Sequence, residues 1–359
     1  MQSPDVSEPP MPRCESTSPA APPRIAVVVN GNARSVNDEV ISTLDRILAG
    51  GDLFVSRRLS DVREIAKTIL GRGYSTVLTG GGDGTFTVVV TAVIKEARRQ
   101  HVAIPRFGLL KLGTGNALAW VVGATSSGLR GLTADIERLQ ADAGSRSMHL
   151  IEVEGQIAPF CGFGADAQLL ADYDKTKSLL LKTPLRGLAQ GFVSYGLAAA
   201  TRTIPSSVFL PMPHVHVTNI GDTANRLGTK GSRVGSPLEH GDTLYEGPAC
   251  LAALSTIPYW GFGFRAFPYA NERTDRMQLR ISTITAGPFL RNFKAIWRGE
   301  YEGSDIIFDY LVSAVRIEID PPSPFQIGGD YIGIRETIEA ALTDEPIRLV
   351  DFYAPPSAA

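Results

Sequence analysis

The chain has 359 residues, 43% of them hydrophobic and 20% charged, so it can bury a core and is long enough for two domains. Lys and Arg number 35 against 37 Asp and Glu, and the formal net charge of −2 argues against a dedicated nucleic-acid-binding protein. The three cysteines lie far apart and no apolar run reaches about 20 residues, so neither a disulfide framework nor a transmembrane helix is expected, and the cytoplasm is the expected compartment.

Residues 1–23 differ in composition from the rest of the chain. Prolines crowd there among serine, glutamate and alanine, and there is no apolar core of signal-peptide length. Such a segment cannot bury enough apolar surface to offset the entropy lost on ordering. We therefore predict a disordered tail over residues 1–23.

Short apolar runs alternate with segments of helical periodicity between residues 24 and 147. The run Ile25–Val29 indicates a strand buried on both faces. Further strands are expected at 53–55, 76–79 and 107–110, with helices between them. The segment Phe86–Ala97 keeps helical spacing despite its valines. This alternation predicts a doubly wound parallel α/β sheet.

The second half of the chain reads as a mostly antiparallel β domain. Turns rich in Gly, Pro, Asn and Asp separate short β-like segments. One helix is expected to interrupt them, starting near Thr183-Pro184. This pattern predicts a β-sandwich with an inserted helix. The strands are expected at His149–Val153, Val208–Leu210, Val215–Val217, Ala249–Ser255, Met277–Ile284 and Val315–Ile319.

Three glycine-rich loops leave the carboxyl ends of expected strands in the first half. They are Asn30-Gly31-Asn32, Gly80–Thr85 and Gly113-Thr114-Gly115-Asn116. Glycine lets backbone N–H groups approach an anion, and a following helix N-terminus adds a favourable dipole. One such loop is equally well a corner, but three at one sheet edge predict a nucleotide site. Arg57-Arg58 follows another strand and could reach a phosphate or form a solvated pair.

The common nucleotide and hydrolase signatures are missing from this sequence. No lysine follows a glycine, so there is no P-loop, and no GxGxxG stands after the first strand. HRD, DFG, GxSxG and HExxH are also absent. The three glycine loops must therefore be interpreted without these motifs.

Gly81-Gly82-Asp83-Gly84-Thr85, followed by Leu112-Gly113-Thr114-Gly115-Asn116, resembles the diacylglycerol kinase catalytic-domain family, which includes bacterial lipid kinases and sphingosine kinases. GGDG resembles the NAD kinases more distantly. Later segments look like the family's GFDA-type, P-x-A…D-G and Asp-Gly-Glu elements, so the resemblance covers about residues 24–355. These segments are Gly162–Ala167, Pro268-Tyr269-Ala270 with Asp275, and Phe325–Asp330.

The resemblance implies a domain organisation. A nucleotide-binding α/β domain, similar to that of NAD and diacylglycerol kinases, would comprise residues 24–147 plus about 335–355. A β-sandwich domain for the lipid substrate would comprise residues 148–334. Ile347–Val350 would be the strand that returns to the first domain.

The resemblance also implies ATP-dependent transfer of the γ-phosphoryl group to a lipid hydroxyl, of a diacylglycerol or sphingoid type, with Mg²⁺. Asp83 and Asp330 would be catalytic, Asp83 and Asp275 would bind metal, and Asp83 could instead contact ribose. The cofactor-binding residues would be Asn30, Gly31, Asn32, Ser56, Gly81, Gly82, Gly84, Thr85, Gly113, Thr114, Gly115 and Asn116. The protein would meet its lipid as a peripheral protein at the membrane surface; no nucleic-acid partner is expected, and a homodimer is left open.

Three positions depart from the family pattern. Phe86-Thr87-Val88 stands soon after GGDGT, where Asn-Glu is frequent, Ala117 stands where Asp is frequent, and Gly328 stands where the family carries the Asp of Asp-Gly-Glu. Asp330 is the nearest carboxylate and could act as base, metal ligand or ordinary turn residue. Two alternatives therefore stay open: a kinase of a soluble acceptor, as in NAD kinases, and an inactive nucleotide- or lipid-binding homologue.

Other candidate residues have simpler interpretations. Asp166 could cap a helix or act in catalysis, and Asp275 fits a hairpin better than a metal site. His214 and His216 share one strand face, as a metal pair would, but no third ligand is apparent. The aromatic segment Tyr259–Phe264 could line a lipid entrance, although burial in the core is the more usual place for aromatics.

Overall fold

The computed structural model describes residues 24–33, 35–48, 52–113, 115–125, 128–140, 144–164, 167–172, 211–301, 303 and 305–353. Several sequence predictions fall outside these residues. They are the disordered tail 1–23, Thr114, Asp166, the strand at Val208–Leu210 and the helix starting near Thr183.

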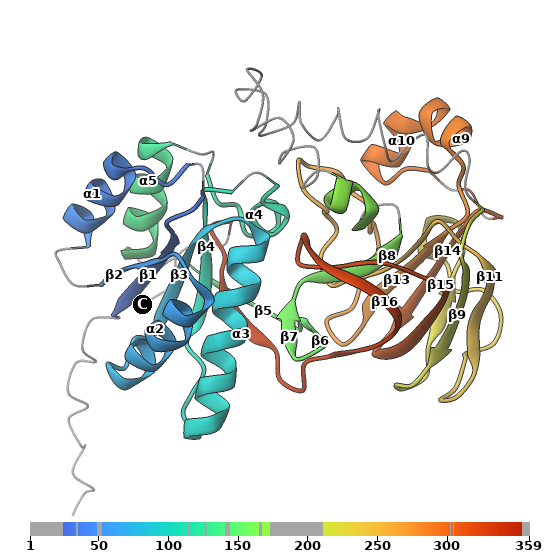
Figure 1. Cartoon of the computed structure of the whole chain (residues 1–359), viewed down its shortest axis with the longest axis horizontal. Coiled ribbons are helices and arrows are strands. Elements are labelled where there is room, and N and C mark those ends of the chain that lie inside the picture. The colour runs from blue at the N-terminus through green and yellow to red at the C-terminus, as the bar shows by residue number, and fades with distance from the viewer. Residues whose placement is uncertain are drawn as a thin grey trace, which may run out of the picture.

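The first of two sheets has six strands, in the order β2-β1-β3-β4-β17-β5 (Figure 1). Neighbouring strands are parallel except β5, which runs antiparallel to β17. The expected doubly wound sheet is thus confirmed, with one antiparallel edge strand. The strands are β1 Ile25–Asn30, β2 Leu53–Ser56, β3 Thr76–Gly81, β4 Arg106–Lys111, β5 Ser145–Met148 and β17 Ile347–Val350.

Helices cover both faces of this sheet, because successive side chains of a buried strand point to opposite faces. Ala26 and Val28 of β1 pack with α2, α3 and α4, whereas Val27 and Val29 pack with α1 and α5. Thr76–Gly81 leads directly into α3, in which Val89, Val90 and Val93 are buried as the helical spacing predicts. The helices are α1 Asp38–Ile47, α2 Leu59–Gly71, α3 Asp83–Gln100, α4 Ala117–Val122 and α5 Leu129–Gln140.

The second sheet lies beside the first (Figure 1) and has eleven strands among the described residues, and every strand pair in it is antiparallel. This confirms the mostly antiparallel character expected for the second half. Its own apolar core includes Phe163, Phe325 and Leu254. The strands are β6 Ile151–Val153, β7 Gln156–Ala158, β8 Phe160–Gly164, β9 His214–Asn219, β10 Asn225–Leu227, β11 Thr243–Pro248, β12 Leu251–Ser255, β13 Met277–Ser282, β14 Ile307–Val312, β15 Ala314–Ile327 and β16 Asp330–Leu342.

The chain returns to the first sheet through β17, which pairs with β4 and β5. The return of Ile347–Val350 is therefore confirmed. Before it, β16 stays paired with β15 and β6 as far as Leu342. The predicted domain boundaries at 147/148 and near 335 stay predictions, and the strand pairings favour a return after Leu342.

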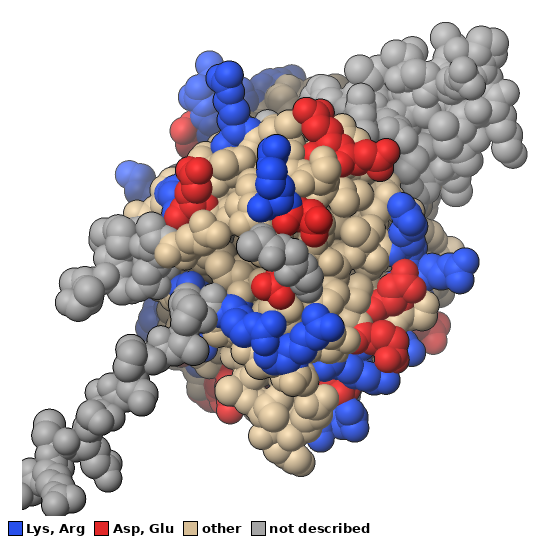
Figure 2. Space-filling view, turned by 90° about the vertical axis from the view of Figure 1, so that its left-hand side faces the viewer, with Lys and Arg blue, Asp and Glu red and all other residues tan. Residues whose placement is uncertain are grey.

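The face of the molecule shown in Figure 2 carries Lys and Arg side chains interspersed with Asp and Glu. This mixture agrees with the formal net charge of −2. In the part of the chain that the structure describes, no helix combines the length and apolarity needed to cross a bilayer.

Candidate functional site

The three glycine-rich loops meet at the carboxyl edge of the six-stranded sheet, as their positions in the sequence predict. Asn30 ends β1, and its Nδ2 donates to Oγ1 of Thr85 in the first turn of α3 at 3.3 Å. The Oδ1 of Asn30 accepts a hydrogen bond from the N–H of Asn32 at 2.9 Å. Asn30 thereby holds its own loop in shape and ties it to the GGDGT segment.

The second and third loops touch backbone to backbone. A Cβ atom at Gly113 would overlap Cα of Gly82, so only glycine permits this crossing. Asn116 then folds its loop back: its Oδ1 accepts from the N–H of Gly113 at 3.1 Å and its Nδ2 donates to the carbonyl of Gly113 at 2.6 Å. The GGDGT and GTGN motifs are thus parts of one packed unit.

Asp83 connects α3 to α4. Its carboxylate accepts hydrogen bonds from the N–H groups of Ala117 at 2.8 Å and Leu118 at 3.0 Å, the first two residues of α4. These N–H groups lack acceptors within their own helix. Burial raises the pKa of Asp83, and the two amides oppose that shift. Asp83 therefore has a defined structural role, while its catalytic and metal-binding roles stay predictions.

The N-terminus of α3 supplies the groups that suit an anion. The strand ends at Gly81, Gly82 is the N-cap, and an 18-residue helix begins at Asp83. The first-turn N–H groups have no acceptor in the helix, and the helix dipole favours negative charge there. This end of α3 is the expected phosphate-binding position.

The second sheet contributes a carboxylate to the same end of α3. Gly328 and Gly329, with φ of +58° and +84°, form the two-residue turn between β15 and β16. Asp330 follows this turn, and a Cβ atom at Gly84 would overlap its carboxylate. The absence of a side chain at Gly84 therefore lets Asp330 approach the first turn of α3 closely.

Two of the three departures from the family pattern lie against each other. A Cβ atom at Gly328 would overlap Oγ1 of Thr87, one turn into α3. The hydroxyl of Thr87 is buried and has no hydrogen-bond partner among the described residues. Thr87, from the segment where Asn-Glu is frequent in the family, therefore faces Gly328, which stands where the family's Asp is expected.

Two predicted site residues use their polar groups elsewhere. The hydroxyl of Ser56 is buried and donates to the carbonyl of Val29 at 3.3 Å, within the sheet. The Asp275 carboxylate pairs with Arg273 at 2.6 Å and with Arg276 at 3.1 Å. The hydrogen bonds from Arg273 lower the pKa of Asp275 to about 2. These contacts favour the hairpin interpretation of Asp275, and its metal-binding role stays a prediction.

The histidine pair forms no metal site among the residues described. His216 contacts Glu318 at 3.1 Å and Thr243 at 3.2 Å. Across the described ranges, no group of three or more His, Cys, Asp or Glu side chains is placed to hold a metal ion. His214 and His216 are therefore consistent with an ordinary strand face.

Two cations lie next to the glycine loops. The Arg57 side chain packs over Gly31, where a Cβ atom would lie 3.2 Å from its Nε. Lys111 ends β4 immediately before the GTGN loop, and its Nζ lies 4.8 Å from the ring centre of Trp120. The sequence interpretation missed Lys111, although its position at the carboxyl end of a strand was the available signal.

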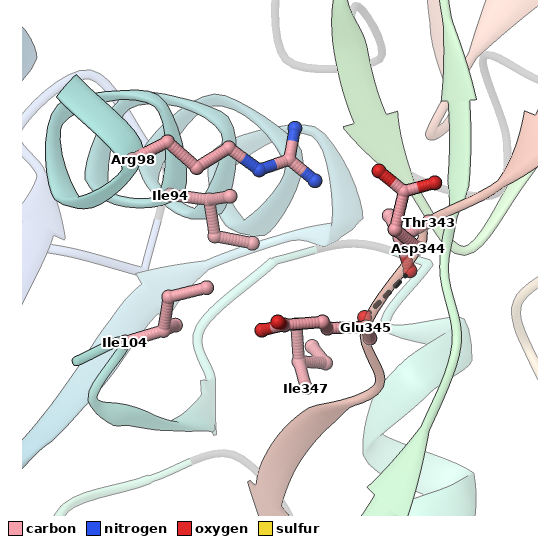
Figure 3. Close-up of a pocket in the computed structure, with 7 residues that line it drawn as sticks. All are labelled: Ile94, Arg98, Ile104, Thr343, Asp344, Glu345 and Ile347. Atoms are coloured by element: carbon pink, nitrogen blue, oxygen red, sulfur yellow. Dashed lines mark hydrogen bonds between the residues drawn. The ribbon is translucent and has the colours of Figure 1, made fainter. Parts of the chain in front are cut away.

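A small cavity of about 130 Å³ lies away from this site, near the C-terminal part of α3 (Figure 3). Arg98 lies on one side of it and Asp344 on the other. It is smaller than typical ligand pockets of about 300–1,000 Å³. The cavity therefore does not compete with the glycine loops as a nucleotide site.

Comparison with known proteins bears on this arrangement. Residues 24–152 match the family model described as diacylglycerol kinase catalytic domain. A probable YegS-like lipid kinase of Xanthomonas oryzae pv. oryzae is 26% identical over 168 residues, which cover 44% of this chain and 52% of the relative. One of Xanthomonas euvesicatoria pv. vesicatoria is 26% identical over 196 residues, which cover 52% and 59%. The match thus spans about half the length of these curated relatives.

Solved structures share the fold over more of the chain. A diacylglycerol kinase structure from Bacillus anthracis aligns with a TM-score of 0.56 at 13% identity, covering 91% of this chain and 96% of the other. Two further structures from that organism give TM-scores of 0.60 and 0.59 at 14% and 13% identity. These likenesses concern the fold. The resemblance to the diacylglycerol kinase catalytic-domain family is thus confirmed for residues 24–152, the part of the chain that the family model matches.

Proposed function

We propose that this protein is an ATP-dependent lipid kinase that transfers the γ-phosphoryl group of ATP to a lipid hydroxyl. The observation that carries the proposal is the approach of Asp330 to Gly84. It brings an acidic side chain from the second sheet to the helix end where the family match and the glycine loops favour phosphate. The names of the curated relatives support the lipid kinase class.

In the proposed reaction, the first-turn N–H groups of α3 bind phosphate oxygens of ATP. Arg57 and Lys111 add positive charge beside the loops. The Asp330 carboxylate accepts the proton of the lipid hydroxyl while that oxygen forms a bond to the γ-phosphorus. The bond from the γ-phosphorus to the bridging oxygen breaks, and ADP leaves with that electron pair. Catalysis is then mainly positioning and charge stabilisation.

The side chains at this site could hold Mg²⁺ only if ATP supplied further ligands to the ion. Mg²⁺ commonly takes one or two protein carboxylates and completes its shell with phosphates and water. Asp330 fits this role, and Asp83 could contribute a remaining lone pair while it holds the amides of α4. When bound, the ion would neutralise charge on the phosphates.

The acceptor class in the proposal is a lipid hydroxyl of the diacylglycerol or sphingoid type. The test is a screen of diacylglycerol, sphingoid bases, ceramide and glycerolipids with labelled ATP and Mg²⁺, using the wild type and Asp330→Asn. Removing a general base typically costs about 10²–10⁴-fold in kcat, and we expect a loss of that size with ATP-dependent thermal stabilisation retained. Asp344→Asn is the matched control, because Asp344 is an exposed carboxylate at the distant cavity.

Phosphorylation of none of these lipids by the wild type would contradict the proposal, and so would full turnover by Asp330→Asn. Turnover of a soluble acceptor without vesicles or detergent would indicate the NAD kinase-like alternative. A second candidate function is a catalytically inactive nucleotide- or lipid-binding homologue. It is favoured by Gly328, which lacks the family's carboxylate and lies too close to Thr87 for an added Cβ. It predicts stabilisation by ATP without turnover.

A further inference from the structure

The helix pair α9 (Ala286–Arg291) and α10 (Phe293–Arg298) lies at the periphery of the second sheet (Figure 1). Of the residues in these two helices, Ile296 is the one that is buried. Leu290 is 59% exposed and Phe293 is 44% exposed. Large apolar side chains of a globular domain are usually buried, so this concentration needs a physical explanation.

The charges on the pair all have one sign. Arg291, Lys294 and Arg298 are exposed, and no Asp or Glu occurs between Ala286 and Gly299. None of the three cations forms an ion pair with a described residue. The pair therefore presents exposed leucine and phenylalanine together with three cations that lack acidic neighbours along the segment.

Ring contacts connect α10 to a turn that borders the candidate active site. Phe293 contacts Trp297 at 5.4 Å between ring centres, and Trp297 stacks on Phe264 at 5.2 Å. Phe264 belongs to the turn 259–264, in which Phe262 is 39% exposed and donates its N–H to the carbonyl of Gly115 at 3.0 Å. Ring contacts thus run from α10 to Phe264, and the backbone of Phe262 in the same turn reaches the GTGN loop.

We propose that α9, α10 and Phe262 form a docking surface for an anionic lipid bilayer. Helices that lie in a membrane interface combine aromatic and leucine side chains with Lys and Arg, because the first enter the acyl boundary and the second attract anionic headgroups. A second copy of the chain suits the surface less well. A two-fold interface would set three cations against three cations.

The docking surface indicates where on the protein the lipid substrate of the proposed kinase would arrive. Lipid drawn from the bilayer at Phe293 and Phe262 would enter beside the loop that holds Gly115. This delivery role rests on the proposed kinase function, whereas docking itself does not. The two are therefore separable by experiment.

The test is co-sedimentation of the full chain with vesicles of phosphatidylcholine alone or mixed with phosphatidylglycerol, without ATP. We expect binding to the mixed vesicles that weakens with added salt. The double variant Leu290→Ser, Phe293→Ser and the triple variant Arg291→Gln, Lys294→Gln, Arg298→Gln should each bind at least about tenfold more weakly. Leu59→Ser with Val102→Ser is the matched control, because these residues are 67% and 44% exposed on other helix ends and should not affect binding.

Equal vesicle binding by the wild type and both α9–α10 variants overturns the docking proposal. A shift from dimer to monomer in the variants, seen by size-exclusion chromatography without a change in vesicle binding, also overturns it and assigns the surface to self-association. Turnover of a short-chain, water-dispersed lipid is measured separately. Vesicle binding that depends on α9–α10 without any turnover supports docking and contradicts the kinase function.

Discussion

Two regions surround the first turn of α3, and they meet it in different ways. On the side of the six-stranded sheet, the GTGN loop packs its backbone against Gly82. The Asp83 carboxylate accepts hydrogen bonds from the first two backbone N–H groups of α4. On the side of the second sheet, the Gly328-Gly329 turn meets α3 mainly through the side chains of Asp330 and Thr87. The first region keeps the motifs GGDGT and GTGN and carries one departure from the family pattern, Ala117, whereas the other two departures meet in the second region.

The difference indicates which contacts tolerate change. A backbone-to-backbone crossing has no side chain that can adjust, so substitution forces the loops apart. When a side chain packs against a turn, substitutions at both positions together can restore the fit between them. At the second region the carboxylate of Asp330 stands two residues after Gly328, and Thr87 faces Gly328 itself.

Gly113→Ala should have the largest effect on stability. Its Cβ would overlap Cα of Gly82, and neither backbone can move without displacing GGDGT or GTGN. Overpacking of this kind costs about 1–3 kcal/mol, and we expect about 3 kcal/mol in urea unfolding because both partners are backbone. ATP-dependent thermal stabilisation should weaken as well.

The control for this prediction lies two residues further on. A Cβ atom at Gly115 would lie 3.7 Å from the nearest atom, Oδ2 of Asp83, which is an ordinary contact. Gly115→Ala should therefore change the free energy of unfolding by about 0.5 kcal/mol or less. If both variants lose the same stability, the backbone crossing is not what makes this region intolerant.

Gly328→Ala should have an intermediate effect that depends on Thr87. A residue with a Cβ at positive φ costs about 1–2 kcal/mol, and overlap with Oγ1 of Thr87 adds to it, so about 2 kcal/mol is expected. Gly329→Ala shares the positive φ, but its Cβ would lie 3.8 Å from Phe160, so only the backbone cost of about 1 kcal/mol applies.

A double-mutant cycle checks the contact. On a Thr87→Ala background, the cost of Gly328→Ala should fall toward that of Gly329→Ala, because the overlapping oxygen is gone. Strict additivity of Thr87→Ala and Gly328→Ala would show that the two departures are independent. The cycle thus tests whether the effect of a substitution at Gly328 depends on the residue at position 87.

The sequence predicted the first region well and the second less well. Ile25–Val29 and the segments after it carry strong periodicity, and the three loops end neighbouring parallel strands, so their meeting followed from topology. The hydrogen bonds of Asp83 to Ala117 and Leu118 were not predictable, because they join residues 34 and 35 positions apart. Side chains at such separations are placed by tertiary packing and leave no local pattern.

The contact of Asp330 with Gly84 was only partly predictable from the sequence. The resemblance singled out Asp330, but only the two-residue turn at Gly328-Gly329 and the pairing of β15 with β8 and β16 bring it to α3. Lys111 was missed because it belongs to no motif and is placed by the end of β4. Ser56 was among the cofactor-binding residues that the resemblance implies, but its hydroxyl donates to the carbonyl of Val29.

Thr87→Val should have the smallest effect and the opposite sign. The buried hydroxyl has no hydrogen-bond partner among the described residues, so an isosteric methyl removes a desolvated group without removing a bond. We expect a gain of about 1 kcal/mol in the free energy of unfolding.

Thr91, one turn later in α3, is the control, because its Oγ1 accepts the N–H of Ile157 at 2.8 Å. Thr91→Val should lose about 1–2 kcal/mol by leaving that N–H unpaired. If Thr87→Val loses as much stability as Thr91→Val, the Thr87 hydroxyl must have a hydrogen-bond partner. The polar groups of the second region would then be held in hydrogen bonds, as those of the first region are.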